Sequence, residues 1–218
     1  MELKKQIYFS PFGRVISIIQ NWFSFFSRPF MVYGYYSCFD SKFKKHTRIS
    51  SSVIIMNKNN LQIGNNVWIW HYSIIDATNK VMIGEGCQIG AWVGIFTHSS
   101  HIAIRLYGGE SYIKAPQDER MGYISGEVII GEYTFIGAKS TILPNIKIGK
   151  GCLIAAGTLV NKSVPDFSIV VGNPGMIKGS TKELDKKYFN EKLVQQNYFD
   201  KETIHQYLQN NPLGRNIE

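Results

Sequence analysis

Aliphatic residues recur every six positions through the middle of the chain. In the second half of this region the series is unbroken, and each member is followed four positions later by a small or β-branched residue or a cysteine. The leading residues there are Ile130, Ile136, Ile142, Ile148, Ile154 and Val160, and the plus-four residues are Thr134, Ser140, Ile146, Cys152, Thr158 and Val164. A helix needs apolar residues at a period of about 3.6 and an ordinary strand at a period of 2. The pattern therefore predicts short strands joined by tight corners, with three strands to a coil of about 18 residues.

The first half of the repeat has the same period but slips by two residues at Leu61-Gln62 and at Val81-Met82. We interpret each slip as a small bulge at a corner. The leading residues of this half are Phe43, Ile49, Ile55, Ile63, Ile69, Ile75, Ile83, Ile89 and Ile95. Glycine follows several of them, as at Ile63-Gly64, because a tight corner needs backbone angles that glycine adopts easily. The stacked leading residues are expected to form the core of an all-β solenoid, a parallel β-helix.

The six-residue period is interrupted between Ser99 and Glu127. Loops of this length inside a compact domain are usually functional, so we expect a functional loop that leaves the third coil. The chain then divides into an N-terminal extension (1–42), a β-helix domain (43–179, with the loop at 99–127) and a C-terminal cap (180–218). The cap mixes charged and apolar residues as one or two amphipathic helices do. Such helices would cover the open end of the last coil.

The N-terminal extension combines aromatic with basic residues. Its longest uncharged stretch, 15–27, has 13 residues. A membrane-spanning helix needs roughly 20 apolar residues, so we expect neither a transmembrane helix nor a standard signal peptide. Two interpretations remain open. The segment could form a helix that covers the core, or its aromatic side chains, beside Lys4, Lys5, Arg14 and Arg28, could lie along a membrane surface.

The net charge and the cysteine content indicate which kinds of partner and which redox compartment suit the protein. The chain has 24 Lys and Arg against 16 Asp and Glu, a net charge of +8, which favours anionic partners such as a phosphorylated cofactor or lipid headgroups. No nucleic-acid-binding module is visible, so no nucleic-acid partner is expected. Cys38, Cys87 and Cys152 have the spacing of neither a zinc cluster nor a disulfide framework. A reducing compartment suits them.

Two segments of the repeat resemble a known family. Residues 63–68, Ile-Gly-Asn-Asn-Val-Trp, and residues 130–178, with Val-Val-Gly-Asn-Pro-Gly at 170–175, are similar to the hexapeptide-repeat acyltransferases. Within them, the similarity is to the maltose, galactoside and nodulation-factor acetyltransferases and to polysaccharide O-acetyltransferases, over residues 43–179. The resemblance implies a left-handed parallel β-helix and a homotrimer. It also implies that acetyl-CoA binds between neighbouring subunits, with no metal required.

The activity implied by the resemblance is transfer of an acetyl group from acetyl-CoA to a sugar hydroxyl of a bacterial surface glycan or its precursor. A base must take the hydroxyl proton, and histidine suits that task near neutral pH. The family's catalytic histidine stands where the third coil meets the long loop, and this chain has His98 and His101 there. An alignment with the galactoside acetyltransferases places the catalytic position on Ser100, and one with the streptogramin-type acetyltransferases places it on His101. Many polysaccharide O-acetyltransferases have a His-x-His pair there, and its first histidine corresponds to His98. We expect one histidine to be the base and the other to orient it or the acceptor.

The resemblance also implies where the cofactor and the acceptor bind. Small or cationic residues that would line the acetyl-CoA groove are Ala138, Ala156, Asn161, Lys162 and Lys178. Candidates for the acceptor site are His71, Trp70, Trp92, Arg105, Tyr107 and Glu110, since aromatic faces beside polar groups suit carbohydrates. Two positions depart from the family: Met176 replaces a frequent Arg, and Trp70 replaces the Asn of the galactoside enzymes. His46 and His205 are expected at the surface.

Several alternatives compete with this reading. An N-acetyltransferase that acts on a nucleotide-linked amino sugar is the main one, because the same fold hosts both acceptors. A γ-type carbonic anhydrase needs three zinc-binding histidines across two coils, a spacing that His71, His98 and His101 do not reproduce. A purely structural solenoid would not need a long loop beside paired histidines. We expect a cytoplasmic enzyme, peripheral at the inner face of the membrane if the N-terminal extension meets a lipid-linked acceptor there.

Overall fold

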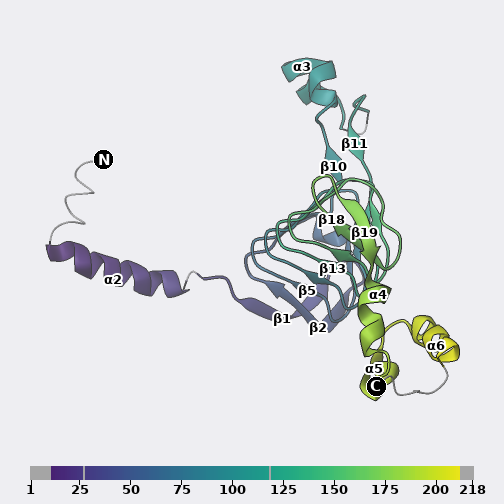
Figure 1. Cartoon of the computed structure of the whole chain (residues 1–218). Coiled ribbons are helices and arrows are strands. Elements are labelled where there is room, and N and C mark those ends of the chain that lie inside the picture. Colours follow the sequence, from purple (N-terminus) through teal and green to yellow (C-terminus); the bar gives the residue numbers. More distant parts are fainter. Residues whose placement is uncertain (1–10, 27, 118, 212–218) are drawn as a thin grey trace. The chain divides into compact units, whose positions relative to one another are not determined.

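The structure, a computed structural model, describes residues 11–26, 28–117 and 119–211. The chain divides into two units, Met1–Phe30 and Met31–Glu218. Among the described residues, the first unit contains helix α2 (Pro11–Phe26), and the second contains the strands and the other helices (Figure 1). The division falls earlier than the boundary at residue 42 that the sequence predicted, because β1 (Met31–Ser37) pairs with β2 (Lys42–Ser50) as a hairpin. Lys4 and Lys5 lie outside the described residues.

Three sheets of short strands form the body of the second unit, and the chain passes from one to the next around each coil (Figure 1). Sheet I has the order β1, β2, β5 (Trp68–Ile69), β8 (Gln88–Ile89), β13 (Phe135–Ile136), β16 (Leu153–Ile154), β18 (Ser168–Val171) and β19 (Met176–Ser180). Sheet II has the order β17 (Leu159–Val160), β14 (Thr141–Ile142), β9 (Gly94–Ile95), β6 (Ile74–Asp76) and β3 (Ile54–Met56). Sheet III has the order β15 (Lys147–Ile148), β12 (Val128–Ile130), β7 (Val81–Ile83) and β4 (Leu61–Ile63).

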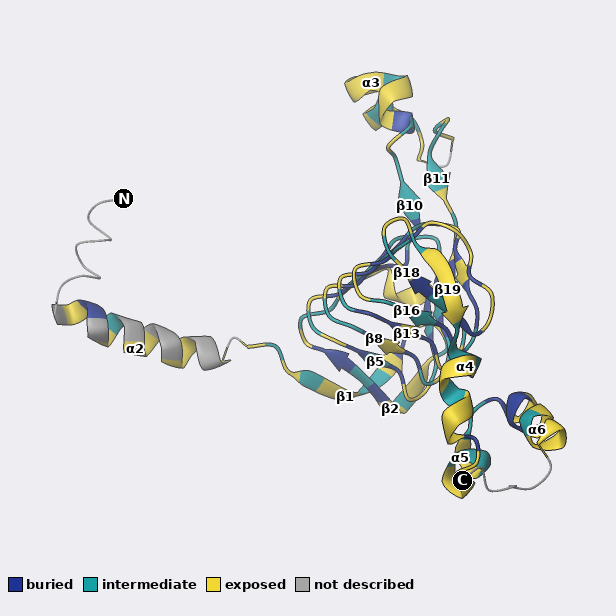
Figure 2. Cartoon of the chain, viewed as in Figure 1, coloured by how far each residue is buried: buried dark blue, intermediate teal, exposed yellow. Residues whose placement is uncertain are grey.

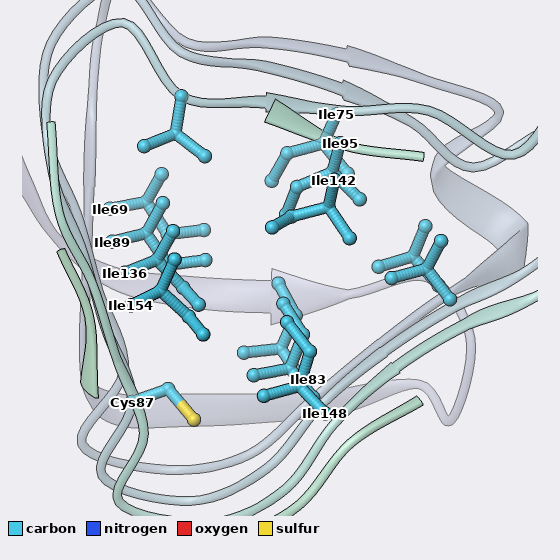
Figure 3. Packing of buried hydrophobic residues seen from close by; sticks show 14 of the residues in the cluster. Ile69, Ile75, Ile83, Cys87, Ile89, Ile95, Ile136, Ile142, Ile148 and Ile154 are labelled. Carbon is cyan, nitrogen blue, oxygen red and sulfur yellow. The ribbon is translucent and has the colours of Figure 1, made fainter. Parts of the chain in front are cut away.

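The leading aliphatic residues stack in columns inside the coils, as the six-residue period predicts (Figure 3). On sheet I the parallel register places Ile69 beside Ile89, Ile89 beside Ile136, and Ile136 beside Ile154. On sheet II it places Ile75, Ile95 and Ile142 in line. Each of these side chains is at most 2% exposed. The strand repeat and its buried core are therefore confirmed.

The plus-four positions carry a second layer of order. Thr134 and Ser140 are buried, and each donates a hydrogen bond from its hydroxyl to a backbone carbonyl of the following coil, Thr134 to Gly149 (2.8 Å) and Ser140 to Ala155 (2.9 Å). Ser73 makes the same bond to the carbonyl of Gly90. A buried hydroxyl is costly unless it is paired. These bonds satisfy the hydroxyls and join neighbouring coils.

The structure corrects one leading residue and explains the two slips. Phe43 is 64% exposed rather than buried, because β2 begins in an antiparallel hairpin before it enters the first coil. The slips lie at corners, before β4 and before β7. A 3₁₀ turn, η1 (Lys58–Asn60), precedes β4, and Lys80 with a φ of 79° precedes β7. The extra residues therefore lie in longer turns at these corners, and the strands that follow pair in regular register.

The long loop forms an arm with its own secondary structure. Strands β10 (His98–Ser99) and β11 (Ile124–Ser125) pair antiparallel at its base, and helix α3 (Ala103–Lys114) lies at its far end (Figure 1). Gly108 interrupts α3 with a φ of 64°. Most residues of α3 are exposed (Figure 2).

The C-terminal segment folds into short helices, α4 (Thr181–Asp185), η2 (Lys186–Tyr188), α5 (Lys192–Asn197) and α6 (Lys201–Asn210). It packs against the corner between sheets III and I. Phe199 stacks on Tyr133 with ring centroids 4.6 Å apart, and Asp200 pairs with Lys150 at 2.8 Å. The helical character that the sequence predicted is present, and both of these contacts lie along this corner.

The hydroxyl bonds between coils lead to a stability prediction. Thr134→Val keeps the side-chain shape but removes the donor to Gly149 and the acceptor for the Cys152 N–H. We expect the free energy of unfolding to fall by about 1–3 kcal/mol, because buried backbone groups lose their partners. Denaturant unfolding measures the change. Thr141→Val, on the outer side of sheet II, is the matched control, and equal stability loss in both variants would contradict this account.

Candidate active site

His98 lies where the chain leaves sheet II for the arm. It follows the buried Thr97 and begins β10, pairing with Ser125 at the base of the arm. The preceding coil places Asp76 at the same corner, because Ile75, directly before Asp76 in β6, pairs with Ile95 at the end of β9. The Asp76 carboxylate is fully buried, and its Oδ2 lies 2.7 Å from His98 Nδ1. The two atoms are in close contact, but the geometry at Nδ1 is not that of a well-aligned hydrogen bond.

The Asp76 carboxylate is held by donors on both oxygens. Thr78 donates to Oδ1 from its backbone N–H (3.0 Å) and its hydroxyl (2.6 Å), and Thr97 donates twice to Oδ2 at 3.3 Å. Burial alone would raise the pKa of Asp76. The hydrogen bonds from Thr78 and Thr97 and the charge of His98 outweigh it, so the pKa of Asp76 lies below its ordinary value. The buried carboxylate therefore stays ionised beside His98.

The outer side of His98 is bounded by the arm. The ring of Tyr123 stacks on the imidazole with centroids 5.8 Å apart. Burial raises the pKa of Tyr123, and Gln117 donates a hydrogen bond to its hydroxyl. The His98 side chain is 36% exposed. With Nδ1 directed to Asp76, Nε2 is the ring nitrogen left to exchange a proton with a bound molecule.

His101 has a different environment. It is exposed, and its Nδ1 lies 2.8 Å from the Ser99 hydroxyl. The Arg105 guanidinium donates to the His101 carbonyl at the start of α3. Within the described part of the chain, no carboxylate lies within ion-pair distance of the His101 ring. Of the two predicted histidines, His98 therefore has the support that orients an imidazole.

The corner between sheets I and II carries the aromatic candidates. Trp70 stacks on Trp68 with centroids 5.0 Å apart, and Trp92 stacks on Tyr72 at 5.7 Å. A mostly apolar groove of about 460 Å³ runs beside them, lined by Trp68, Trp70, Gln88, Ile89, Gly90, Ala91, Phe135 and Ala138. His71 lies in the same turn, and its Nδ1 is 2.6 Å from the Ser50 hydroxyl. This corner offers exposed aromatic faces beside small residues.

The predicted cofactor residues fall on separate parts of the molecule. Ala138 and Ala156 follow β13 and β16, at the corner between sheets I and II. Asn161 and Lys162 follow β17, at the corner between sheets II and III, where His98 also lies. Both are exposed. Lys178 lies in β19, at an irregularity in its pairing with β18 on sheet I. One chain therefore does not gather the whole set around a single groove.

The backbones of neighbouring coils approach each other closely at Ala138 and Ala156. A Cβ at Gly137 would lie 2.4 Å from the Ala156 nitrogen, and a Cβ at Gly90 would lie 2.6 Å from the Ala138 nitrogen. The coils are thus in direct backbone contact at this corner. Gly157 has open space around it.

The remaining candidates have structural partners. Within α3, Arg105 bonds to the backbone of His101, and Glu110 pairs with Lys114 at 3.3 Å. The Tyr107 hydroxyl accepts from the Met121 N–H at 2.9 Å. His46 and His205 are exposed, as predicted. Among the described residues, no three His, Cys, Asp or Glu side chains converge as a metal site.

Comparison with known proteins agrees with the repeat. The family profile described as bacterial transferase hexapeptide (six repeats) matches residues 127–162. A Lysinibacillus sphaericus protein named probable macrolide acetyltransferase is 30% identical over 131 residues, which are 56% of this chain and 68% of that protein. The chain belongs to the hexapeptide-repeat acyltransferases. The resemblance drawn from the sequence is thereby confirmed.

Other members of the hexapeptide-repeat acyltransferases match over shorter shares of their length. A galactoside acetyltransferase solved in complex with coenzyme A has 25% identity and a TM-score of 0.51, over 62% of each chain. Serine acetyltransferase 4 of Arabidopsis thaliana is 33% identical over 144 residues, which are 66% of this chain and 36% of that protein. The chain spans less than two fifths of the length of several curated relatives.

Sequence reasoning missed Asp76 and Tyr123. A signal for Asp76 was present, since it directly follows the leading residue Ile75 and the period predicts that Ile75 and Ile95 stack. An acidic residue at a coil position next to the core is unusual and is a candidate partner for a nearby histidine. Tyr123 gave no such signal, because residues 99–127 have no period from which its neighbours could be derived.

The Asp76 network predicts a pH-dependent contribution to stability. A carboxylate whose folded pKa is lowered stabilises the folded state above its unfolded pKa, and this contribution is lost as pH falls through the folded pKa. Asp76→Asn should lower the free energy of unfolding by roughly 1.5–3 kcal/mol near neutral pH, because bonds to a charged acceptor are lost. The difference from wild type should shrink below about pH 4.

Denaturant unfolding from acidic to neutral pH measures this difference. Glu119→Gln, which changes an exposed carboxylate in the arm, is the control and should track wild type at every pH. A difference between wild type and Asp76→Asn that stays constant down to the most acidic pH would show that Asp76 is not held ionised by this network.

Proposed function

We propose that the protein is an acetyl-CoA-dependent O-acetyltransferase that acts on a sugar hydroxyl of a bacterial surface glycan or its precursor. The observation that carries this proposal is the pair of His98 with the buried, ionised Asp76 at the base of the arm. Family membership supports the reaction class, and the galactoside acetyltransferase solved with coenzyme A supports the donor. The family also supports a left-handed winding of the coils.

His98 is the general base in this proposal. Its Nε2 accepts the proton of the acceptor hydroxyl as that oxygen attacks the thioester carbonyl carbon, and the C–S bond then breaks. Nδ1 keeps its proton on the side of the ring that faces Asp76 Oδ2, 2.7 Å away. Asp76 stabilises the imidazolium that forms, and the proton on Nε2 is then available to the leaving sulfur. Acetyl-CoA, when bound, supplies the acetyl group as an activated thioester. Asp76 acts through His98 and is a positioning residue, and His101 is a helper that orients the acceptor or the arm.

We assign the donor to a groove between subunits of a homotrimer. In one chain, Ala138 and Ala156 lie at the corner between sheets I and II. Asn161 and Lys162 lie with His98 at the corner between sheets II and III. The groove would be complete if the corner of one subunit that carries Ala138 faced the corner of a neighbouring subunit that carries His98. Small residues would then contact the pantetheine arm, and Lys162 and Lys178 would meet phosphates as cations.

The acceptor in this proposal lies against the exposed aromatic faces. Trp70 and Trp92 are 41% and 56% exposed, and Lys139 lies 5.8 Å from the Trp92 ring centroid. Flat aromatic faces beside polar groups stack on sugar rings. His71 would fix the turn that carries Trp70, through its contact with Ser50. Arg105 and Tyr107 would act mainly by holding the arm in place. We further propose that the enzyme works at the cytoplasmic side, where acetyl-CoA and glycan precursors are available.

The shared groove predicts the assembly state. We expect a solution mass three times the 24.8 kDa of one chain, measured by light scattering at the concentration used for activity. The reason is that the residues of the proposed donor groove lie at two separate corners of the coils in one chain. A monomer that is fully active at that concentration would contradict a site built from two subunits.

The His98 pair predicts the effects of substitution on rate. His98→Ala should lower kcat/KM by roughly 10²- to 10⁴-fold, the usual effect of removing a positioned base. Asp76→Asn should lower kcat more than it raises KM, because it disturbs the orientation of His98 and not binding. His101→Ala should cost less. Thiol release from acetyl-CoA is followed with hydroxyl and amino sugar acceptors, including glycolipid precursors and nucleotide-linked amino sugars.

His205→Ala, an exposed histidine far along the chain, is the control and should retain the wild-type rate. Binding of acetyl-CoA is checked in each variant. Wild-type turnover by both His98→Ala and His101→Ala would overturn the histidine mechanism. Turnover of amino acceptors alone would replace the O-acetyltransferase proposal with an N-acetyltransferase.

A further inference from the structure

We infer that helix α2 is an anchor that lies on the surface of an anionic lipid bilayer. This inference goes beyond acetyl transfer and does not depend on it. Large apolar side chains of α2 are between 49% and 73% exposed: Phe12, Val15, Ile18, Ile19, Trp22, Phe23 and Phe26. At about 100° per residue, they fall within an arc of about 140° on one side of the helix. A continuous apolar stripe that is exposed to this extent marks a site of interaction with a protein or a membrane.

The length of α2 decides between spanning a membrane and lying on it. The helix has 16 residues and is about 24 Å long, shorter than the roughly 30 Å hydrocarbon core of a bilayer. No helix in the described residues is long and apolar enough to cross a membrane. A short helix with one apolar face binds in the plane of the interface instead.

The residue types on the stripe fit a lipid interface. The Trp22 ring meets Phe23 and Phe26 edge to face, with centroids 5.7 and 5.0 Å apart. Tryptophan and other aromatic residues favour the depth of the lipid headgroups, where one part of the side chain is wet and the other apolar. The stripe therefore presents an aromatic cluster together with aliphatic side chains.

The distribution of charge identifies the type of lipid. Residues 1–75 contain nine Lys and Arg and two acidic residues, whereas residues 76–218 contain 15 Lys and Arg and 14 acidic residues. Nearly all of the net charge of the chain is therefore in its first third. An excess of cations in the same part of the sequence as an amphipathic helix strengthens attraction to anionic headgroups. Pairing of α2 with α2 of a second copy would cover the stripe, but it would not use the excess of cations in this part of the sequence.

The β1–β2 hairpin, considered by itself, has the same composition. Tyr33, Tyr36 and Phe43 are 73%, 59% and 64% exposed, and Lys42 and Lys45 are exposed on the same hairpin. Aromatic side chains beside lysines are again typical of a bilayer interface. The hairpin is thus a second element that suits the same partner.

Flotation of the full chain with vesicles tests the inference. We expect binding to vesicles of phosphatidylcholine with phosphatidylglycerol, weaker binding to phosphatidylcholine alone, and release as salt rises, because salt screens the cations. The double variant Ile19→Ser/Trp22→Ser should bind the anionic vesicles at least roughly 10-fold more weakly, since two apolar side chains no longer insert. Leu193→Ser, at a 73% exposed position in α5, is the matched control and should bind as wild type.

Solution mass and thermal unfolding of each variant show whether the fold is retained. Equal flotation of wild type and the double variant, or equal binding to both kinds of vesicle, would overturn the inference. A fall in solution mass of the double variant without any vesicle binding by wild type would also overturn it, because a second copy would then be what covers the stripe. These readouts do not involve acetyl transfer, so they fail or succeed separately from the proposed function.

Discussion

The stacking of each coil on the next in strict register is the constraint on which the β-helix body depends. Parallel ladders align Ile75 with Ile95 and Ile95 with Ile142, and each buried isoleucine contributes about 1.5–3 kcal/mol of apolar burial. Hydroxyls such as that of Thr134 add a bond from one coil to the next. Because side chains alternate between the faces of a strand, a shift of one residue would turn a whole column outward. Register is therefore specified at every coil.

The same register creates the site. It places Asp76 on one coil beside His98 on the next, at the point where the chain leaves sheet II to form the arm. A buried carboxylate is costly unless donors surround it, and Thr78 and Thr97 supply them. A perturbed carboxylate that meets a partly exposed histidine is an arrangement found at functional sites more often than in structural cores. Burial of the Asp76 carboxylate costs free energy, and the same buried carboxylate orients His98.

The sequence allowed the coil architecture to be predicted because one period repeats along most of it. The error at Phe43 arose where a residue fits the period but pairs outside the coil, with the antiparallel β1, which a local pattern does not reveal. Helix α3 was not predicted because residues 99–127 have no period. The candidate groove residues were named from the family resemblance. Their separation at two corners of the coils follows from the way in which the coils stack. The proposal of His98 rather than His101 as the base likewise depends on the position of Asp76, which the sequence did not reveal.

The central claim is that Asp76 fixes the proton of neutral His98 on Nδ1 and leaves Nε2 free to act as the base. Nitrogen NMR of the full chain with ¹⁵N-labelled histidine tests this claim most directly, with His98→Gln used to assign the resonances. The account predicts that the Nδ1–H tautomer of His98 is the major one in the wild-type protein and is no longer the major one in Asp76→Asn. An Nε2–H tautomer for His98 in the wild-type protein would contradict it.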